Sequence, residues 1–144
     1  AFDRSNVILR NTPVLIAGWG RIAKCLAKLL SSLGAEVTIT ARKEADTAIA
    51  GALGYHAVPL ERIVPRLADY RIIFNTVPAM VLPEQKAKLC RADCLKIDLA
   101  SVPGISGTDV ITARGLPGKL APETAGHLIA KTILGLTAHK EVSS

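Results

Sequence analysis

The sequence predicts an α/β fold: a Rossmann-like, doubly wound parallel sheet in a single domain. The first reason is a glycine-rich turn at residues 18–23, and the second is an uninterrupted apolar run just before it. The third is a regular alternation of strand-like and helix-like segments after the turn, which is typical of a parallel sheet covered on both faces. A chain of 144 residues is long enough for one hydrophobic core.

The first unit is a strand, a helix and a second strand. Residues 13–17 form the apolar run, which indicates a strand buried on both faces. A helix follows, because apolar residues recur at helical spacing among polar ones; they are Ile22, Leu26, Leu29, Leu30 and Leu33. Gly34 ends this helix, and Val37 and Ile39 mark the second strand.

The alternation continues along the rest of the chain. Further strands are expected at residues 55–58, 71–75, 94–98 and 109–113. Further helices are expected around Ala45, Ile49, Ala52 and Leu53, over residues 60–67, from Pro83 onward and from Pro122 onward. The sheet is therefore expected to have five or six strands, with the glycine turn at the carboxyl edge of its central strand.

The domain organisation follows from these boundaries. Residues 1–12 precede the first strand without a start methionine and are interpreted as a lead-in from a missing upstream domain. Residues 13–138 form the dinucleotide-binding domain, and residues 139–144 are a tail.

Composition narrows the class of protein. The net charge is +6, but the basic residues are dispersed, and the only aromatic residues are two Phe, two Tyr and one Trp. We therefore expect anionic small ligands rather than nucleic acid. No secretory signal and no membrane span are expected. Cys25, Cys90 and Cys94 lack paired metal spacing, which favours reduced thiols in a cytoplasmic protein and no metal site.

The glycine turn predicts a phosphate-binding loop. Gly18 permits a tight strand-to-helix turn, Gly20 lets a pyrophosphate approach the backbone, and Ala23 replaces the third glycine of the fingerprint. The expected contacts here are Gly18, Trp19, Gly20, Arg21 and Ile22. The alternative is a structural turn in a domain that binds no ligand.

The end of the second strand sets the cofactor preference. NAD-binding domains place an acidic residue there for the ribose 2′-hydroxyl, whereas this chain has Thr40, Ala41, Arg42 and Lys43. Arginine can pair with a 2′-phosphate. We therefore expect NADP as cofactor, with NAD bound more weakly. The alternative is a pair of surface bases that open the next helix.

Polar loops follow the fourth and fifth strands. Asn75, Thr76, Val77 and Pro78 are expected to line the adenosine and ribose side of the cofactor, unless they form an ordinary turn. Asp98, Ala100 and Ser101 come after the fifth strand. Two roles for Asp98 stay open: orienting a ribose hydroxyl or substrate, or capping the turn.

A loop at residues 114–126 holds two further cations. Arg114 and Lys119 lie close to an expected helix start, which suits an anionic substrate or the nicotinamide end of a cofactor; the alternative is a plain loop into a helix cap. The catalytic acid or base is not identifiable, since His56, His127 and His139 are scattered. Hydride transfer tolerates this, because much of its chemistry belongs to the cofactor.

Several segments, in their order along the chain, resemble the C-terminal nucleotide-binding domain of the dipicolinate synthase A-subunit family. They are residues 18–23, 33–35, 41–42, 73–78, 97–101 and 116–126. The resemblance implies oxidation of dihydrodipicolinate to dipicolinate in endospore formation, with NADP⁺ accepting the hydride. It also implies an oligomeric enzyme that has an N-terminal domain and a second subunit.

The chain departs from that family at two points. Only residues 104–109 stand where the family has a further helical stretch, and Arg114 stands where it tends to have proline. Both changes lie beside the expected nicotinamide pocket. We expect Arg114 and Lys119 to bind the carboxylates of a dicarboxylate substrate, and we expect no turnover by this domain alone, because the second wall of the cleft is missing.

Two alternative functions remain. One is another NADP-dependent dehydrogenase, of the shikimate dehydrogenase kind, which has a similar Asn-Thr-x-Pro loop. The other is a nucleotide-sensing module without chemistry, against which the elaborate loop at 114–126 argues.

Overall fold

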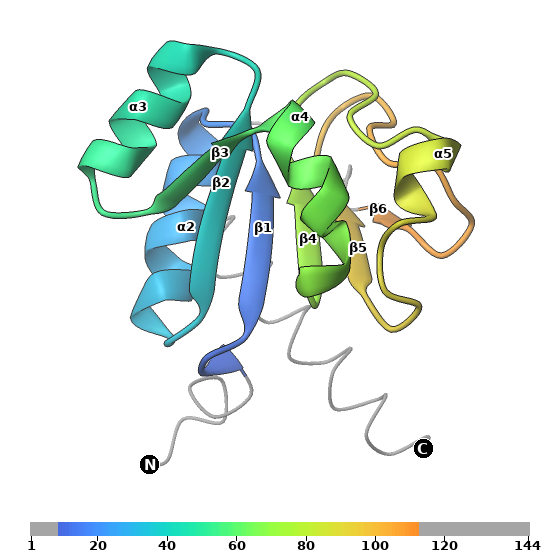
Figure 1. Cartoon of the computed structure of the whole chain (residues 1–144), viewed down its shortest axis with the longest axis horizontal. Helices are drawn as coiled ribbons and strands as arrows, with labels where there is room; N and C mark the ends of the chain where they lie inside the picture. The colour runs from blue at the N-terminus through green and yellow to red at the C-terminus, as the bar shows by residue number, and fades with distance from the viewer. Residues whose placement is uncertain (1–8, 113–144) are drawn as a thin grey trace.

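The computed structural model describes residues 9–112, which form one parallel six-stranded sheet with helices on both faces (Figure 1). The strands are β1 (Pro13–Ala17), β2 (Glu36–Ala41), β3 (His56–Pro59), β4 (Ile72–Asn75), β5 (Leu95–Asp98) and β6 (Ile111–Thr112). The helices are α2 (Arg21–Ser32), α3 (Glu44–Ala52), α4 (Leu60–Ile63) and α5 (Glu84–Ala87), with a 3₁₀ helix η1 at Val64–Asp69. The predicted Rossmann-like α/β fold is confirmed.

The strand order is β3-β2-β1-β4-β5-β6, and every pair is parallel. The chain begins in the middle of the sheet, winds outward to β3, and then returns to build the other half from β4. Strand order reverses between β1 and β4, which is where ligands bind in doubly wound sheets. The predicted position of the glycine turn, at the carboxyl end of central strand β1, is also confirmed.

Strand β1 is buried on both faces, as its apolar sequence predicts. Val14 and Ile16 enter one core and Leu15 and Ala17 the other, because successive side chains of a strand point to opposite faces. The first core lies under α2 and also contains Phe74 of β4. The second lies under α4 and η1.

Helix α2 turns a different face inward from the one its large residues indicate. Its buried residues are Ala23, Leu26, Ala27 and Leu30. Ile22 is exposed, with 36% of its surface accessible, and Leu29 and Leu33 are only half-buried. The two alanines explain the rotation, because small side chains let the helix backbone approach the sheet closely.

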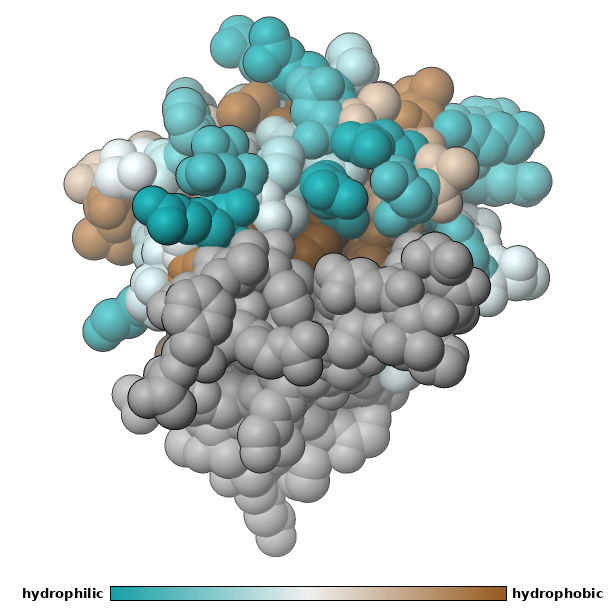
Figure 2. All heavy atoms as spheres, turned by 90° about the horizontal axis from the view of Figure 1, so that it is seen from below, coloured by the Kyte–Doolittle hydropathy of each residue, from teal (hydrophilic) through white to brown (hydrophobic). Residues whose placement is uncertain are grey.

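Helix α3 lies where a helix is predicted, but its large apolar side chains are not buried. Ile49 and Leu53 are 51% and 66% exposed, and Ala50 is the buried residue of the helix. The short strand β3 leaves little sheet surface for α3 to cover, so its larger side chains face outward. On the face seen in Figure 2, hydrophilic and hydrophobic side chains of the described residues are interspersed.

The last crossover is short, as predicted. The segment between β5 and β6 contains no helix among the described residues and pairs with the preceding loop through a single bridge, Leu82 to Ile105. Strand β6 is described over two residues, and the helix predicted from Pro122 lies outside residues 9–112. Within those residues, no helix has the length and apolar character needed to cross a membrane.

A nearly buried lysine on β5 is paired with an acid from the short crossover. The Lys96 ammonium donates to the Asp109 carboxylate over 3.0 Å, and the two side chains are 10% and 58% exposed. This hydrogen bond from Lys96 lowers the pKa of Asp109 below its usual value. The pair therefore links β5 to the segment that leads into β6.

This ion pair predicts a pH dependence of stability. Because the pKa of Asp109 is lowered in the folded state, its contribution is present above the unfolded pKa, about 4, and is lost as the pH falls through the folded pKa. Asp109→Asn should therefore flatten the fall in unfolding free energy on the acid side. Urea denaturation from neutral to acid pH checks this, and added salt should weaken the effect, since Asp109 is largely exposed. Glu36→Gln, at the exposed start of β2, is the control and should keep the wild-type acid profile.

Candidate active site

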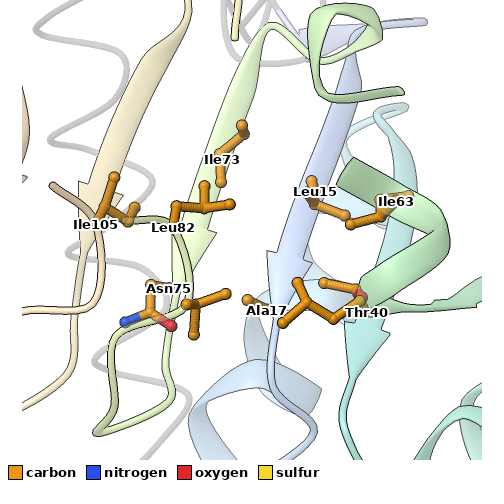
Figure 3. Close-up of a pocket in the computed structure, with 10 residues that line it drawn as sticks. Leu15, Ala17, Thr40, Ile63, Ile73, Asn75, Leu82 and Ile105 are labelled. Carbon is orange, nitrogen blue, oxygen red and sulfur yellow. The ribbon is translucent and has the colours of Figure 1, made fainter. Parts of the chain in front are cut away.

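The register of the sheet brings four strand ends into one row. Ala17 of β1 is paired with Thr40 of β2 and with Asn75 of β4, and Asn75 is paired with Asp98 of β5. Figure 3 shows three of them, Ala17, Thr40 and Asn75, beside one another at the carboxyl edge. The sequence-predicted residues from three separate loops are therefore adjacent in space.

Position 18 requires a glycine because of its backbone conformation and because of the side chains packed against it. Its φ is +112°, which side-chain-bearing residues rarely adopt, and its N–H donates to the carbonyl of Thr40 over 2.8 Å. A Cβ at this position would collide with Thr76 Oγ1 and lie 3.1 Å from Val77 Cγ2. The close contact between the glycine turn and the loop after β4 depends on this missing side chain.

Gly20 has a different role. Its φ is −86°, an ordinary value, and a Cβ here would meet no heavy atom within 4 Å. The residue is exposed and caps α2 without a side-chain hydrogen bond. The open space lies in front of the first backbone N–H groups of α2, where an anion is favoured. Arg21 and Ile22 are exposed beside it.

Trp19 is placed differently from the other residues of the turn. Its side chain is only 6% exposed, belongs to the core under α2, and meets the Tyr55 ring edge to face at 5.7 Å. The Lys24 ammonium lies 5.9 Å from the centre of the indole. A contact of Trp19 with a ligand at the turn would therefore have to come from its backbone.

A hollow lies beside the glycine turn, between the end of β2 and the loop after β4. Its lining residues are Ala17, Thr40, Ala41, Arg42, Leu60, Val77 and Val81. A second hollow, whose lining residues are drawn in Figure 3, shares Thr40 with the first and is also lined by Ile63, Leu82 and Ile105. The sequence analysis missed Leu60 and Val81. Their signal was weak, since Leu60 is one apolar residue at the start of a short helix and Val81 lies in the loop after β4, where no periodic pattern marks it.

Thr40 lines both hollows and carries a buried hydroxyl. The residue is 1% exposed, and its Oγ1 has no hydrogen-bond partner within residues 9–112. Unpaired buried hydroxyl groups are costly, so one that lines a hollow is suited to a ligand.

Arg42 and Lys43 are exposed at the rim of this hollow. The Arg42 guanidinium donates to the carbonyl of Met80, in the loop after β4, over 3.3 Å. Among residues 9–112, it forms no ion pair with a carboxylate. Its charge is therefore available to an anion.

Asn75 and Asp98 form a buried clamp that we call the Asn75–Asp98 pair. The Asn75 amide donates to Asp98 Oδ1 over 3.1 Å and also exchanges hydrogen bonds with the backbone of Val77. Asp98 is fully buried, and its carboxylate also accepts the N–H groups of Ala100 and Gly104, at 3.2 and 2.7 Å. These contacts correspond to the turn-capping alternative for Asp98.

The other predicted residues of these loops have different surroundings, and one of them lines the hollow. Thr76 donates both its backbone N–H and its hydroxyl to the carbonyl of Ala17. Pro78 and Ser101 are exposed, and Ala100 is buried. Val77 is the member that lines the hollow.

Several other candidates lie away from the row or outside the described residues. His56 is exposed at the first residue of β3, so it lies at the opposite, amino edge of the sheet. Arg114, Lys119, His127 and His139 lie outside residues 9–112. Within those residues, no three His, Cys, Asp or Glu side chains come close enough to hold a metal.

Two of the three free cysteines are poor nucleophiles at neutral pH. Burial raises the pKa of Cys90, and burial raises the pKa of Cys94 to about 12. Both of these thiols are therefore protonated and unreactive.

This geometry can be compared with known proteins. The chain is 30% identical to the A subunit of dipicolinate synthase from Bacillus subtilis, over 96% of the chain and 49% of that protein. A crystal structure of the same kind of subunit from Bacillus halodurans superposes with a TM-score of 0.71 at 29% identity, over 89% of this chain and 47% of that one. The predicted resemblance is confirmed. No family model matches the chain.

A second curated relative belongs to another enzyme. Shikimate dehydrogenase (NADP(+)) of Acidiphilium cryptum is 30% identical over 90% of this chain and 45% of that protein. The chain thus spans about half the length of the curated relatives it matches. The domain is of the type found in oxidoreductases.

The two glycines of the turn should respond differently to substitution. Gly18→Ala should lower the unfolding free energy by about 2–5 kcal/mol, from an unfavourable φ and a collision with Thr76. Gly20→Ala, the matched variant, should change it by no more than about 0.5 kcal/mol, since nothing surrounds the new methyl group.

Dinucleotide affinity should also distinguish the roles of the two glycines. The folded Gly20→Ala protein should bind dinucleotide about tenfold more weakly, because the methyl group would stand where we expect a pyrophosphate to approach the backbone. Urea denaturation and titration calorimetry provide the two measurements. Equal stability losses, or unchanged binding by Gly20→Ala, would contradict this account of the turn.

Proposed function

We propose that the domain binds NADP at the carboxyl edge of the sheet, and that NAD binds there more weakly. The observation that carries the proposal is Arg42. It lies at the end of β2, on the rim of the hollow, with no carboxylate paired to it among residues 9–112. An acidic residue at this position would repel a 2′-phosphate, whereas a guanidinium can pair with one.

The residues present fit the dinucleotide. The open space at Gly20 suits the pyrophosphate, and the uncapped start of α2 favours its charge. Val77 and Val81 would contact the adenine, and the Thr40 hydroxyl, which has no partner among residues 9–112, would be available for a hydrogen bond. Arg42 and Lys43 would bind the 2′-phosphate. Bound NADP⁺ supplies an electrophilic nicotinamide ring that accepts a hydride.

We further propose that the whole protein oxidises dihydrodipicolinate to dipicolinate. Similarity to the A subunit of dipicolinate synthase over nearly the whole chain supports this reaction. Arg114 and Lys119 would bind the two substrate carboxylates. The second wall of the cleft would come from a further domain, in an oligomeric enzyme with a second subunit.

A second candidate function is dehydrogenation of a shikimate-like substrate. The relative that supports it is the NADP-dependent shikimate dehydrogenase, at the same identity as the first. Both functions use the cofactor site in the same way. They differ in the substrate.

Arg42 provides the direct test of cofactor preference. Arg42→Ala should weaken NADP binding by about tenfold to a hundredfold, the loss expected for a hydrogen bond to a charged group, and should leave NAD binding nearly unchanged. Titration calorimetry with both nucleotides measures this. Lys28→Ala, which removes an exposed lysine of α2, is the matched control for net charge. Equal losses for both nucleotides in Arg42→Ala would refute recognition of the 2′-phosphate.

The reaction is tested separately. Residues 1–144 alone should bind NADP without turnover, because one wall of a cleft cannot hold substrate at reacting distance. The assembled enzyme should reduce NADP⁺ with dihydrodipicolinate made in situ, followed at the nicotinamide absorbance band. Activity should fall at least about tenfold when Arg114 and Lys119 are changed to Ala. Turnover of shikimate but not dihydrodipicolinate would favour the second candidate.

A further inference from the structure

We infer that Asp98 is a positioning residue for cofactor selectivity: it holds the loop that orients Arg42, without contacting the nucleotide itself. The inference rests on the proposed binding of NADP. It assigns part of the preference for the 2′-phosphate to a carboxylate that lies on β5, whereas the arginine that would bind the phosphate follows β2.

The first step joins Asp98 to Gly104. The fully buried carboxylate accepts the N–H of Gly104 over 2.7 Å, the shortest of its three hydrogen bonds described above. Gly104 is buried, and a Cβ there would collide with the Asn75 amide and come within 2.9 Å of the carbonyl of Ala79. The Asn75–Asp98 pair therefore fixes where the loop after β5 crosses the loop after β4.

The second step joins Gly104 to the loop after β4. The carbonyl of Gly104 accepts the N–H groups of Val81 and Leu82, at 2.8 and 2.9 Å, and Ser106 then donates to the carbonyl of Leu82. Asn75 fixes the start of the same loop through its two hydrogen bonds to Val77. Both ends of the segment 77–82 thus depend on the Asn75–Asp98 pair.

The third step reaches the nucleotide site. Val77 and Val81, near the two ends of that segment, line the hollow, and the carbonyl of Met80 between them accepts the Arg42 guanidinium. Arg42 is otherwise exposed, and this is its one hydrogen bond among the described contacts. Moving the Met80 carbonyl would therefore change where the guanidinium rests.

The sign of the effect distinguishes positioning from simple electrostatics. Removing the charge of Asp98 would, by Coulomb repulsion alone, favour the more anionic NADP over NAD. Loosening the segment 77–82 has the opposite effect, since Arg42 is less well ordered for the 2′-phosphate. If Asp98 were merely structural, its substitution would lower the unfolding free energy and leave the ratio of the two affinities unchanged.

The experiment measures the NADP-to-NAD affinity ratio of Asp98→Asn by calorimetry. We expect the ratio to fall about threefold to tenfold, the size found for residues that act through a network of contacts. Leu30→Ala is the matched control, because it opens a cavity in the core under α2, on the other face of the sheet from Val81 and Leu82, and should lower stability without changing the ratio. An unchanged or increased ratio in Asp98→Asn would overturn the inference.

A second variant covers the case in which Asp98→Asn does not fold. Gly104→Ala keeps the carboxylate and its charge but pushes the loop away from Asn75, so it should lower the ratio in the same direction. Hydrogen exchange of the wild-type protein adds a measurement without any substitution. The Val81, Leu82 and Ser106 amides should be more protected with NADP than with NAD, and equal protection would contradict the inference.

The proposed function can fail independently. If wild-type protein shows no preference for NADP, or if Arg42→Ala does not reduce it, the proposed function is wrong. If the preference exists and depends on Arg42 but is insensitive to both Asp98→Asn and Gly104→Ala, only the positioning role is wrong.

Discussion

A buried carboxylate holds together the loops at the carboxyl edge of this sheet. Asp98 lies at the end of β5 with no exposed surface and accepts hydrogen bonds from Asn75 and from two backbone N–H groups. Losing one of these donors would leave a buried carboxylate oxygen without a hydrogen bond, which is costly. The donors are therefore held in place together with the carboxylate. The loops after β4 and β5 therefore have one arrangement relative to each other.

The glycine turn adds a second constraint at the same edge. Gly18 brings the backbone of the turn against Thr76 and Val77, and Thr76 in turn bonds to the last carbonyl of β1. The turn, the end of β2 and the loop after β4 thereby surround one hollow. Arg42 lies on its rim, and Thr40, whose hydroxyl has no partner in the described part of the chain, lines it. The fold does not use the groups that a nucleotide would contact. These groups are the backbone N–H groups at the start of α2, an apolar wall and a cation.

The sequence predicts the strands and helices well because their periodicity is strong, and it predicts the site where a residue type has one use. Gly18 is such a residue, because its φ of +112° and its close neighbours require a glycine. The role of Arg42 in cofactor preference stays a prediction. The sequence predicts poorly which face of a helix is buried: Ile22, Ile49 and Leu53 are large and apolar but exposed. Burial depends on how closely the backbone of a helix can approach the sheet, and small residues such as Ala23 and Ala27 decide that.

The sequence by itself determined the parallel sheet, its glycine turn and the chemistry available at the strand ends. Only the tertiary structure decided what each polar residue does there. By sequence alone, Asp98 is equally suited to bind a ribose or to cap a turn, and the choice depends on the position of Gly104, six residues away in a segment without regular structure. Leu60 and Val81 likewise become part of the site through contacts between segments far apart in the chain. Such contacts depend on packing between elements, which no local pattern of residues encodes.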